Sequence, residues 1–140
     1  MESTLAIIKP DAVLRGNAGK ILAHLEAQRF RIRGIRMLHL TTAQAAAFYE
    51  VHRERPFYDS LVRFMTSGPC VPIALDRAAA VATLREVIGA TDPAEAAAGT
   101  VRALYAESKE RNAIHASDSD ENAAREIAFF FSERDRIGTR

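Results

Sequence analysis

The sequence contains a single cysteine, Cys70, and no excess of charge of either sign. One cysteine cannot form an internal disulfide, which excludes a disulfide-stabilised fold and fits a reducing compartment. The 19 Lys and Arg residues balance 18 Asp and Glu residues, and this argues against a specific nucleic-acid partner. No apolar run is long enough to span a bilayer, and the N-terminus lacks the basic start of a secretory signal. We therefore predict a cytoplasmic protein with no membrane partner.

The hydrophobic pattern predicts four strands. Residues 5–8 form a short, continuous apolar run, which is typical of a strand buried on both faces. Residues 31–40 alternate between polar and apolar side chains, the pattern of a half-buried strand. Residues 70–75 indicate a third strand, and residues 113–115 indicate a brief fourth one.

Helical signals alternate with these strands. Thr41 followed by Gln44 is a capping box that opens a helix. Apolar residues at helical spacing before Gly89 predict another helix, which ends at that glycine. Further helices are predicted after Asn17, near Pro56 and after the Ser- and Asp-rich segment 117–120.

This order of strands and helices predicts an α+β sandwich with helices packed against one sheet. The length suits a single domain that spans residues 1–140. Residues 90–112 carry no clear apolar period. A stretch of this length without a pattern, inside a compact domain, indicates either a functional or a disordered segment.

His115 is the candidate nucleophile. The sequence contains no P-loop, dinucleotide-binding fingerprint, paired cysteine ligands or serine nucleophile elbow. His115 lies where a short apolar strand meets a loop rich in Ser and Asp, just before a helix, so a neutral imidazole there is available for attack. By pattern alone, an ordinary surface or packed histidine is still the slightly better interpretation. That interpretation also applies to His24, His39 and His52, which fall inside predicted helices or strands.

For the other candidate residues too, spacing alone does not decide between a functional and an ordinary structural role. Glu126 in the last helix could fix the tautomer of the imidazole, although a solvated helix face explains it better. Single cationic side chains are usually surface charges, and a pair of apolar residues one helical turn apart is more often part of a core than a clamp on a flat ring. Lys9, Arg85 and Arg102 are therefore most simply interpreted as surface charges, and Phe57 with Leu61 as part of the core.

Taken together, five sequence blocks resemble the nucleoside diphosphate kinase family. They occur in the order found in the family, from about residue 4 to residue 131, and the last one is the highly specific family signature. The blocks read TLAIIKPDA (4–12), RERPF (53–57), SGP (67–69), GATDP (89–93) and NAIHASDS (112–119).

The resemblance implies a ferredoxin-like βαββαβ fold, an antiparallel sheet with helices packed on it, plus an excursion loop after Gly89. It implies transfer of the γ-phosphate of a nucleoside triphosphate such as ATP to nucleoside diphosphates, in ping-pong order through phosphorylated His115. Mg²⁺ is the expected cofactor, bound through the nucleotide phosphates and not directly by the protein. The resemblance further implies a homo-oligomer, a tetramer or a hexamer built from dimers.

The resemblance also assigns roles by position. Ser117 and Glu126 would support His115 in catalysis, and Phe57 would stack on the base, which predicts broad nucleotide specificity because every base has a π-face. Lys9 and Tyr49 would also be catalytic. Contacts with phosphates or ribose are implied for Lys9, Tyr49, Arg85, Thr91, Arg102 and Asn112.

Several positions depart from the family pattern. Ala116 stands where the family generally has Gly, and a positive φ there would cost an alanine about 1 kcal/mol. Leu104 replaces a common Asp, Ala98 a frequent Pro, and Lys109 a usually apolar residue near the base. Pro72 falls in an inner strand, where it cannot donate to the ladder.

These departures motivate a second interpretation, a weakly active, nucleotide-binding regulatory paralogue on the same fold. A third is a nucleic-acid-binding module, since ferredoxin-like sheets also serve that role. The near-neutral charge and the lack of an aromatic strand motif count against it.

Overall fold

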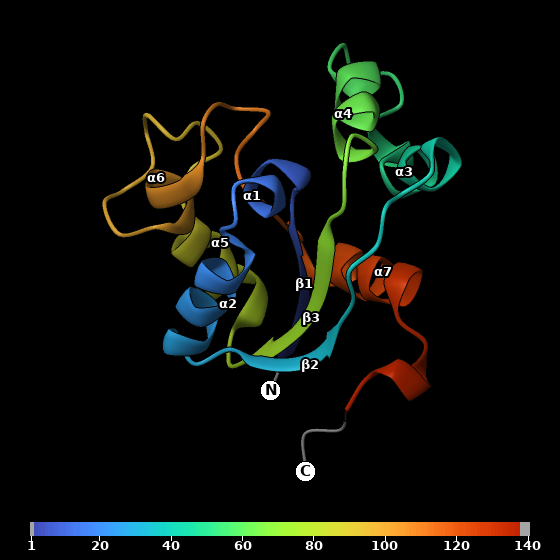
Figure 1. Ribbon diagram of the computed structural model, residues 1–140. Coiled ribbons are helices and arrows are strands. Elements are labelled where there is room, and N and C mark those ends of the chain that lie inside the picture. Colours follow the sequence, from blue (N-terminus) through green and yellow to red (C-terminus); the bar gives the residue numbers. More distant parts are fainter. Residues whose placement is uncertain (1, 138–140) are drawn as a thin grey trace.

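A four-stranded antiparallel sheet forms the centre of the protein, as a computed structural model that describes residues 2–137 shows (Figure 1). The strand order is β2-β3-β1-β4, and every neighbouring pair is antiparallel. This order and the helices packed on the sheet confirm the predicted ferredoxin-like fold. The strands are β1 (Glu2–Ile8), β2 (Arg31–Ile35), β3 (Val71–Arg77) and β4 (Ile114–Ala116).

Helices cover both faces of the sheet, so that two separate apolar clusters form (Figure 1). One cluster contains residues of α1 (Pro10–Leu14), α2 (Ala18–Ala27), α5 (Ala80–Ile88) and α6 (Val101–Tyr105). The other contains residues of α3 (Thr42–Phe48), α4 (Tyr58–Met65) and α7 (Asp120–Phe130). Short 3-10 turns lie at Glu50–His52 and Glu133–Asp135.

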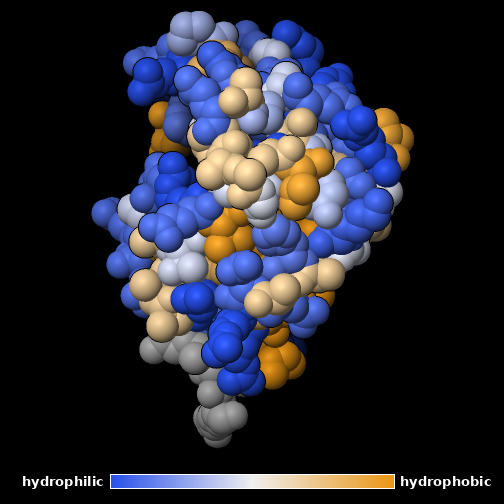
Figure 2. Space-filling view, turned by 90° about the vertical axis from the view of Figure 1, so that its left-hand side faces the viewer, coloured by the Kyte–Doolittle hydropathy of each residue, from blue (hydrophilic) through white to orange (hydrophobic). Residues whose placement is uncertain are grey.

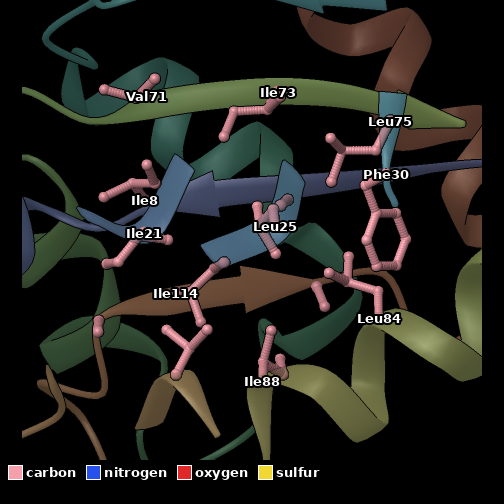
Figure 3. Packing of buried hydrophobic residues seen from close by; sticks show 14 of the residues in the cluster. Ile8, Ile21, Leu25, Phe30, Val71, Ile73, Leu75, Leu84, Ile88 and Ile114 are labelled. Atoms are coloured by element: carbon pink, nitrogen blue, oxygen red, sulfur yellow. The ribbon is translucent and has the colours of Figure 1, made fainter. Parts of the chain in front are cut away.

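The position of β1 between the two clusters explains why its sequence is continuously apolar. Leu5 and Ile7 join the α3–α4–α7 cluster, whereas Ala6 and Ile8 join the α2–α5 cluster. Successive side chains of a strand point to opposite faces, so a strand covered on both sides needs apolar residues at every position. Figure 3 shows the α2–α5 cluster, in which side chains of β1, β3 and β4 pack among those of α2 and α5.

Pro72 is accommodated in the inner strand β3 because its backbone faces the end of β2. Arg36 N–H donates to the Pro72 carbonyl at 3.1 Å, which places the polar backbone edge of Pro72 on the β2 side. β2 ends at Ile35, so the N–H that proline lacks would have pointed beyond the regular ladder. The pairing of Pro72 with Ile7 on the other side keeps β3 in register with β1.

Two elements differ from the sequence pattern. The alternation over residues 31–40 predicts one long strand, but regular β2 ends at Ile35 after a register shift between Ile32 and Gly34. The pairing continues only through the Arg36 bond to Pro72 and the isolated bridge from Leu38 to Cys70, among the described residues. Within residues 90–112, α6 forms where no apolar period was visible. Its start is fixed by Thr100, whose hydroxyl accepts from Ala103 N–H.

The described part of the chain contains no helix long and apolar enough to cross a membrane. Figure 2 looks onto the side of the molecule where α6 lies and shows hydrophilic residues over most of that face, with apolar residues between them.

Gly89 is the position at which a side chain is least tolerated. It follows α5 with φ 90° and ψ −179°, a backbone conformation that is essentially restricted to glycine. A Cβ there would lie 2.5 Å from Thr100 Oγ1. We expect Gly89→Ala to lower the free energy of unfolding by about 3 kcal/mol, and hence Tm by roughly 6–12 °C in a thermal melt.

The matched control is Gly19→Ala. Gly19 lies in α2, and a Cβ there meets nothing within 4 Å, so alanine should raise stability by up to about 1 kcal/mol. A Gly89→Ala protein as stable as the wild type would contradict the strained backbone.

Candidate active site

His115 lies in the edge strand β4, where it pairs with Ile7 of β1. Its neighbours Ile114 and Ala116 belong to the α2–α5 cluster, so the alternation of the strand directs His115 to the opposite face. There the imidazole meets the edges of the Phe48 and Tyr49 rings, at centroid distances of 5.4 and 6.2 Å. The side chain keeps 19% of its surface exposed, enough to be reached by a ligand.

Glu126 of α7 holds the imidazole. Its Oε1 lies 2.7 Å from His115 Nε2 and accepts from the Ser117 hydroxyl, also at 2.7 Å. Burial alone would raise the pKa of Glu126, but the hydrogen bonds from His115 and Ser117 bring it below its ordinary value. An ionised carboxylate only accepts, so Nε2 must carry the proton of the neutral ring. The lone pair of the neutral imidazole is therefore on Nδ1.

Lys9 and Arg102 bring buried positive charge to the same region. Lys9 follows β1, and its ammonium donates to Asn112 Oδ1 at 2.8 Å. Burial, with a smaller contribution from Arg102, lowers the pKa of Lys9 to about 8. The Arg102 guanidinium donates to the carbonyls of Gly89 and Ile114 at 3.0 and 2.8 Å, which ties α6 to both ends of the loop it belongs to.

A backbone clamp fixes the start of β4 against the end of β1. Lys9 N–H donates to the Ala113 carbonyl at 2.8 Å, and Ala113 N–H donates to Asp11 Oδ2 at 3.1 Å. Ala113 has φ 73°, a left-handed conformation that these two bonds hold in place. Asn112 and His115 are thereby set at fixed positions relative to Lys9.

These side chains surround one cavity of about 590 Å³. Phe57, 47% exposed, and Leu61 form an apolar part of its wall. The wall of the cavity includes nine of the ten residues to which the resemblance assigns roles. They are Lys9, Tyr49, Phe57, Arg85, Thr91, Arg102, Asn112, His115 and Glu126. Ser117 is fully buried behind the wall, against Glu126.

Tyr49 contributes a buried phenol. Its hydroxyl has no hydrogen-bond partner among the described residues, and burial raises the pKa of the phenol well above its usual range. The group therefore stays protonated, and its hydroxyl is a buried donor without a partner among the described residues beside the cavity.

Sequence reasoning missed several residues of the cavity wall. Asn122 and Arg125 precede Glu126 by four and one positions in α7, and Asp118 accepts from Asn122 Nδ2 at 2.7 Å. The spacing of Asn122 and Glu126 on one helix face was the available signal. Glu110, Val51 and His52 also line the cavity, as does Lys109, which the resemblance had placed near the base.

The positions that depart from the family pattern do not distort the site. Positive φ values among the described non-glycine residues occur at Arg29, Ala79 and Ala113, so Ala116 avoids the strain that a left-handed conformation would impose. Leu104 is 55% exposed, and Ala98 is exposed as well. His39, for which a surface or packed position was expected, is exposed and contacts the Thr66 carbonyl.

Comparisons with known proteins agree with the geometry. A protein-family model described as "Nucleoside diphosphate kinase" matches residues 2–136. The chain is 58% identical to the nucleoside diphosphate kinase of Chlorobium chlorochromatii (strain CaD3), over 98% of each chain. It is 53% identical to that of Desulfatibacillum aliphaticivorans, covering 99% of this chain and 100% of the relative.

Solved structures give the same result. The nucleoside diphosphate kinase of Aquifex aeolicus superposes with a TM-score of 0.96 at 46% identity, covering 97% of this chain and 99% of that chain. The halophilic enzyme of Halobacterium salinarum, in complex with CDP, gives a TM-score of 0.94 at 35% identity, covering 99% of this chain and 93% of that chain.

Proposed function

The chain belongs to the nucleoside diphosphate kinase family and is a phosphotransferase, and on this basis we propose that His115 carries the phosphoryl group between nucleotides. The observation that supports this most strongly is the 2.7 Å contact between His115 Nε2 and Glu126 Oε1. The contact supports the proposal because Nε2 faces the carboxylate, so that Nδ1 of the neutral ring is the proposed nucleophilic atom.

The proposed transfer has two half-reactions. In the first, the Nδ1 lone pair attacks the γ-phosphorus of a nucleoside triphosphate. The bond from that phosphorus to the β,γ-bridging oxygen breaks, and the nucleoside diphosphate leaves with the electron pair. In the second, a terminal phosphate oxygen of another nucleoside diphosphate attacks the same phosphorus, the bond to Nδ1 breaks and the imidazole returns to its neutral form. One cavity therefore serves donor and acceptor in turn.

The positive charges of the cavity suit the transferred group. Its negative charge spreads over three oxygens in the transition state, so fixed donors around them lower the barrier. Lys9 offers a compact ammonium, whereas Arg85, Arg102 and Arg125 offer forked guanidinium groups. Because Arg102 is already held by two backbone carbonyls, its orientation is set before a nucleotide enters.

We expect Mg²⁺ to enter this cavity as a partner of the nucleotide. Across residues 2–137, no three His, Cys, Asp or Glu side chains gather into a metal site. Mg²⁺ keeps several waters and is commonly held through substrate phosphates with one or two carboxylates, and Asp118 is the exposed carboxylate on the wall. When bound, the ion would neutralise charge on the phosphate oxygens.

We extend the proposal to assembly, domain organisation and location. The edge strand β2 and the exposed side chains of Ile35 and Met37 support self-association, consistent with a tetramer or hexamer of dimers. The single domain spanning residues 1–140 is supported by the family match over almost all of them. The lone cysteine supports a cytoplasmic location.

Labelling tests the proposed function directly. The protein is incubated with Mg²⁺ and γ-labelled ATP, separated from nucleotide, and then given GDP. We expect label on the intact protein that is labile to acid and stable to base, as a phosphohistidine is, and that GDP removes as GTP. No label on the intact protein, under conditions in which the protein is folded, would refute the covalent route and favour a regulatory, nucleotide-binding role.

Lys9 predicts a pH dependence of nucleotide binding. A bound phosphate raises the pKa of Lys9 from its value of about 8, so the complex holds more protons than the free protein. Affinity for ADP should therefore fall as pH rises through 8, by up to about tenfold between pH 7 and 9. Calorimetric titrations at pH 8, in buffers with different ionisation enthalpies, should show proton uptake.

The Lys9→Arg variant is the matched control, because a guanidinium stays charged throughout this range. It should bind ADP without proton uptake at pH 8. Equal proton uptake by both proteins would assign the titration to another group.

Phe57→Ala tests the stacking role. Removal of an exposed stacking ring should raise KM for every nucleotide by about tenfold, with kcat little changed. The ratios of kcat/KM among GDP, ADP, CDP and UDP should stay close to those of the wild type. Phe129→Ala, which removes an exposed ring outside the cavity lining, is the control. A loss confined to one base would contradict stacking.

A further inference from the structure

Two residues of opposite charge lie beside the proposed base-binding surface. Lys109 and Glu110 line the cavity together with Phe57 and Leu61. Ser60, which precedes Leu61 in α4, donates its hydroxyl to Glu110 Oε2 at 2.6 Å. This hydrogen bond places the carboxylate against the same turn of α4 that carries the apolar wall. Stacking on Phe57 uses neither charge. The Glu110 carboxylate also faces Lys9, whose pKa it raises, and this effect is the same for every nucleotide.

The Glu110 carboxylate is fixed and partly free. Ser60 and Glu110 are both half-buried, so their hydrogen bond is partly protected from water. The second oxygen, Oε1, accepts no hydrogen bond from the described residues. A fixed acceptor at the cavity wall has lost its conformational freedom before a ligand binds, which is the condition for selective hydrogen bonding.

The pair presents a specific pattern to the edge of a base. A lysine ammonium only donates and an ionised carboxylate only accepts. Guanine carries the acceptor O6 next to the donors N1–H and the 2-amino group, which is the complement of this pair. Adenine offers an amino donor where guanine has O6. Uracil offers the carbonyl O2, an acceptor, where guanine has the 2-amino group.

We propose that Glu110, held by Ser60, is a specificity-determining residue that favours guanine nucleotides by accepting from N1–H and the 2-amino group, while Lys109 donates to O6. This inference rests on the proposed binding of the base against Phe57. Stacking on Phe57 allows every nucleotide to bind. The hydrogen bonds at the base edge then make guanine nucleotides the preferred ones. Charge-assisted hydrogen bonds at a half-exposed wall favour the matched base by about tenfold.

GDP and IDP provide the sharpest comparison, because IDP differs only in lacking the 2-amino group. Their dissociation constants are measured by calorimetry for the wild type and for Glu110→Ala, Glu110→Gln and Ser60→Ala. We expect wild-type protein to bind GDP about tenfold more tightly than IDP. The ratio should fall to near one in Glu110→Ala and take intermediate values in Glu110→Gln, which keeps an acceptor, and in Ser60→Ala, which releases the carboxylate.

Two further variants separate the roles of neighbouring charges. Lys109→Ala should weaken the binding of GDP and of IDP by the same factor, because both bases carry O6. Glu107→Ala is the charge-matched control, since Glu107 belongs to the same loop, pairs with Arg15 and does not line the cavity. It should leave the ratio at the wild-type value. Thermal melts of each variant confirm that the titrated protein is folded.

A GDP to IDP ratio near one in the wild type, or an unchanged ratio in folded Glu110→Ala, would overturn the assignment of Glu110. Unchanged GDP affinity in Lys109→Ala would overturn the role of Lys109. These binding readouts do not need phosphoryl transfer. If labelling of His115 succeeds and the ratio is one, only the specificity inference fails. If labelling fails and the ratio is about tenfold, the proposed covalent route fails while the base-recognition site stands.

Discussion

His115→Asn should abolish both the phosphoryl label and the kinase activity, with a loss in kcat of about 10⁴-fold or more. Asparagine retains a polar side chain near Glu126 but has no nitrogen lone pair able to attack phosphorus, so neither half-reaction can begin. Nucleotide binding should change little, because the cationic side chains and Phe57 remain in place. The measurements are label incorporation from γ-labelled ATP, steady-state transfer to GDP and calorimetric binding of ADP.

The control for this variant is His24→Asn. His24 lies in α2, outside the cavity, and its replacement should leave labelling and turnover at wild-type levels. Equal labelling of the wild type and His115→Asn would show that another residue accepts the phosphoryl group.

Glu126→Ala should lower kcat by roughly 10²–10³-fold while the dissociation constant of ADP changes little. Without the carboxylate, the imidazole loses the acceptor that keeps the proton on Nε2, and the ring is free to rotate or to change tautomer. The Ser117 hydroxyl also loses its acceptor, which should lower the free energy of unfolding by about 1–3 kcal/mol. On this proposal, Glu126 is a positioning residue.

A spectroscopic readout separates positioning from a general loss of structure. The ¹⁵N chemical shifts of the His115 imidazole should report a protonated Nε2 in the wild type and a mixture of tautomers in Glu126→Ala. Glu121→Ala, at an exposed position in the same helix, is the control and should keep both the tautomer and the rate. A wild-type tautomer combined with a reduced rate would contradict the positioning role.

The same carboxylate predicts how stability responds to acid. The pKa of Glu126 is lowered in the folded protein, so its hydrogen bonds stabilise the fold above the ordinary carboxyl pKa, and this contribution is lost as pH falls through the lowered value. The wild type should thus lose more stability than Glu126→Ala over that acidic range.

The sequence predicted the elements that depend on residues close together in the chain. The continuous run of β1, the capping box of Thr41 with Gln44 and the end of α5 at Gly89 each depend on neighbours in the chain, and the structure confirms all three. The early end of β2 could not be predicted, because the alternation of side chains continues past Ile35 while the regular ladder with β3 does not. α6 escaped notice because a helix of five residues is too short to show an apolar period.

The site was harder to predict because it is assembled across the fold. Local pattern could not decide whether His115 was a nucleophile, and resemblance to a family was needed. Lys9 and Asn112 are 103 positions apart, and nothing in either segment indicates that their side chains meet. The pairing of Ser60 with Glu110 is likewise invisible in sequence, since it spans 50 positions between a helix and a loop.

The clamp that joins Lys9, Asp11 and Ala113 has a consequence for folding during synthesis. It connects the first strand to be synthesised with one of the last, because β1 acquires its neighbour β4 only after more than a hundred further residues have been added. A nascent chain therefore lacks the proposed nucleotide-binding cavity until β4 and α7 have left the ribosome. Nucleotide in the cell should then bind only finished chains and stabilise them by mass action, so that unfinished chains neither capture nor consume it.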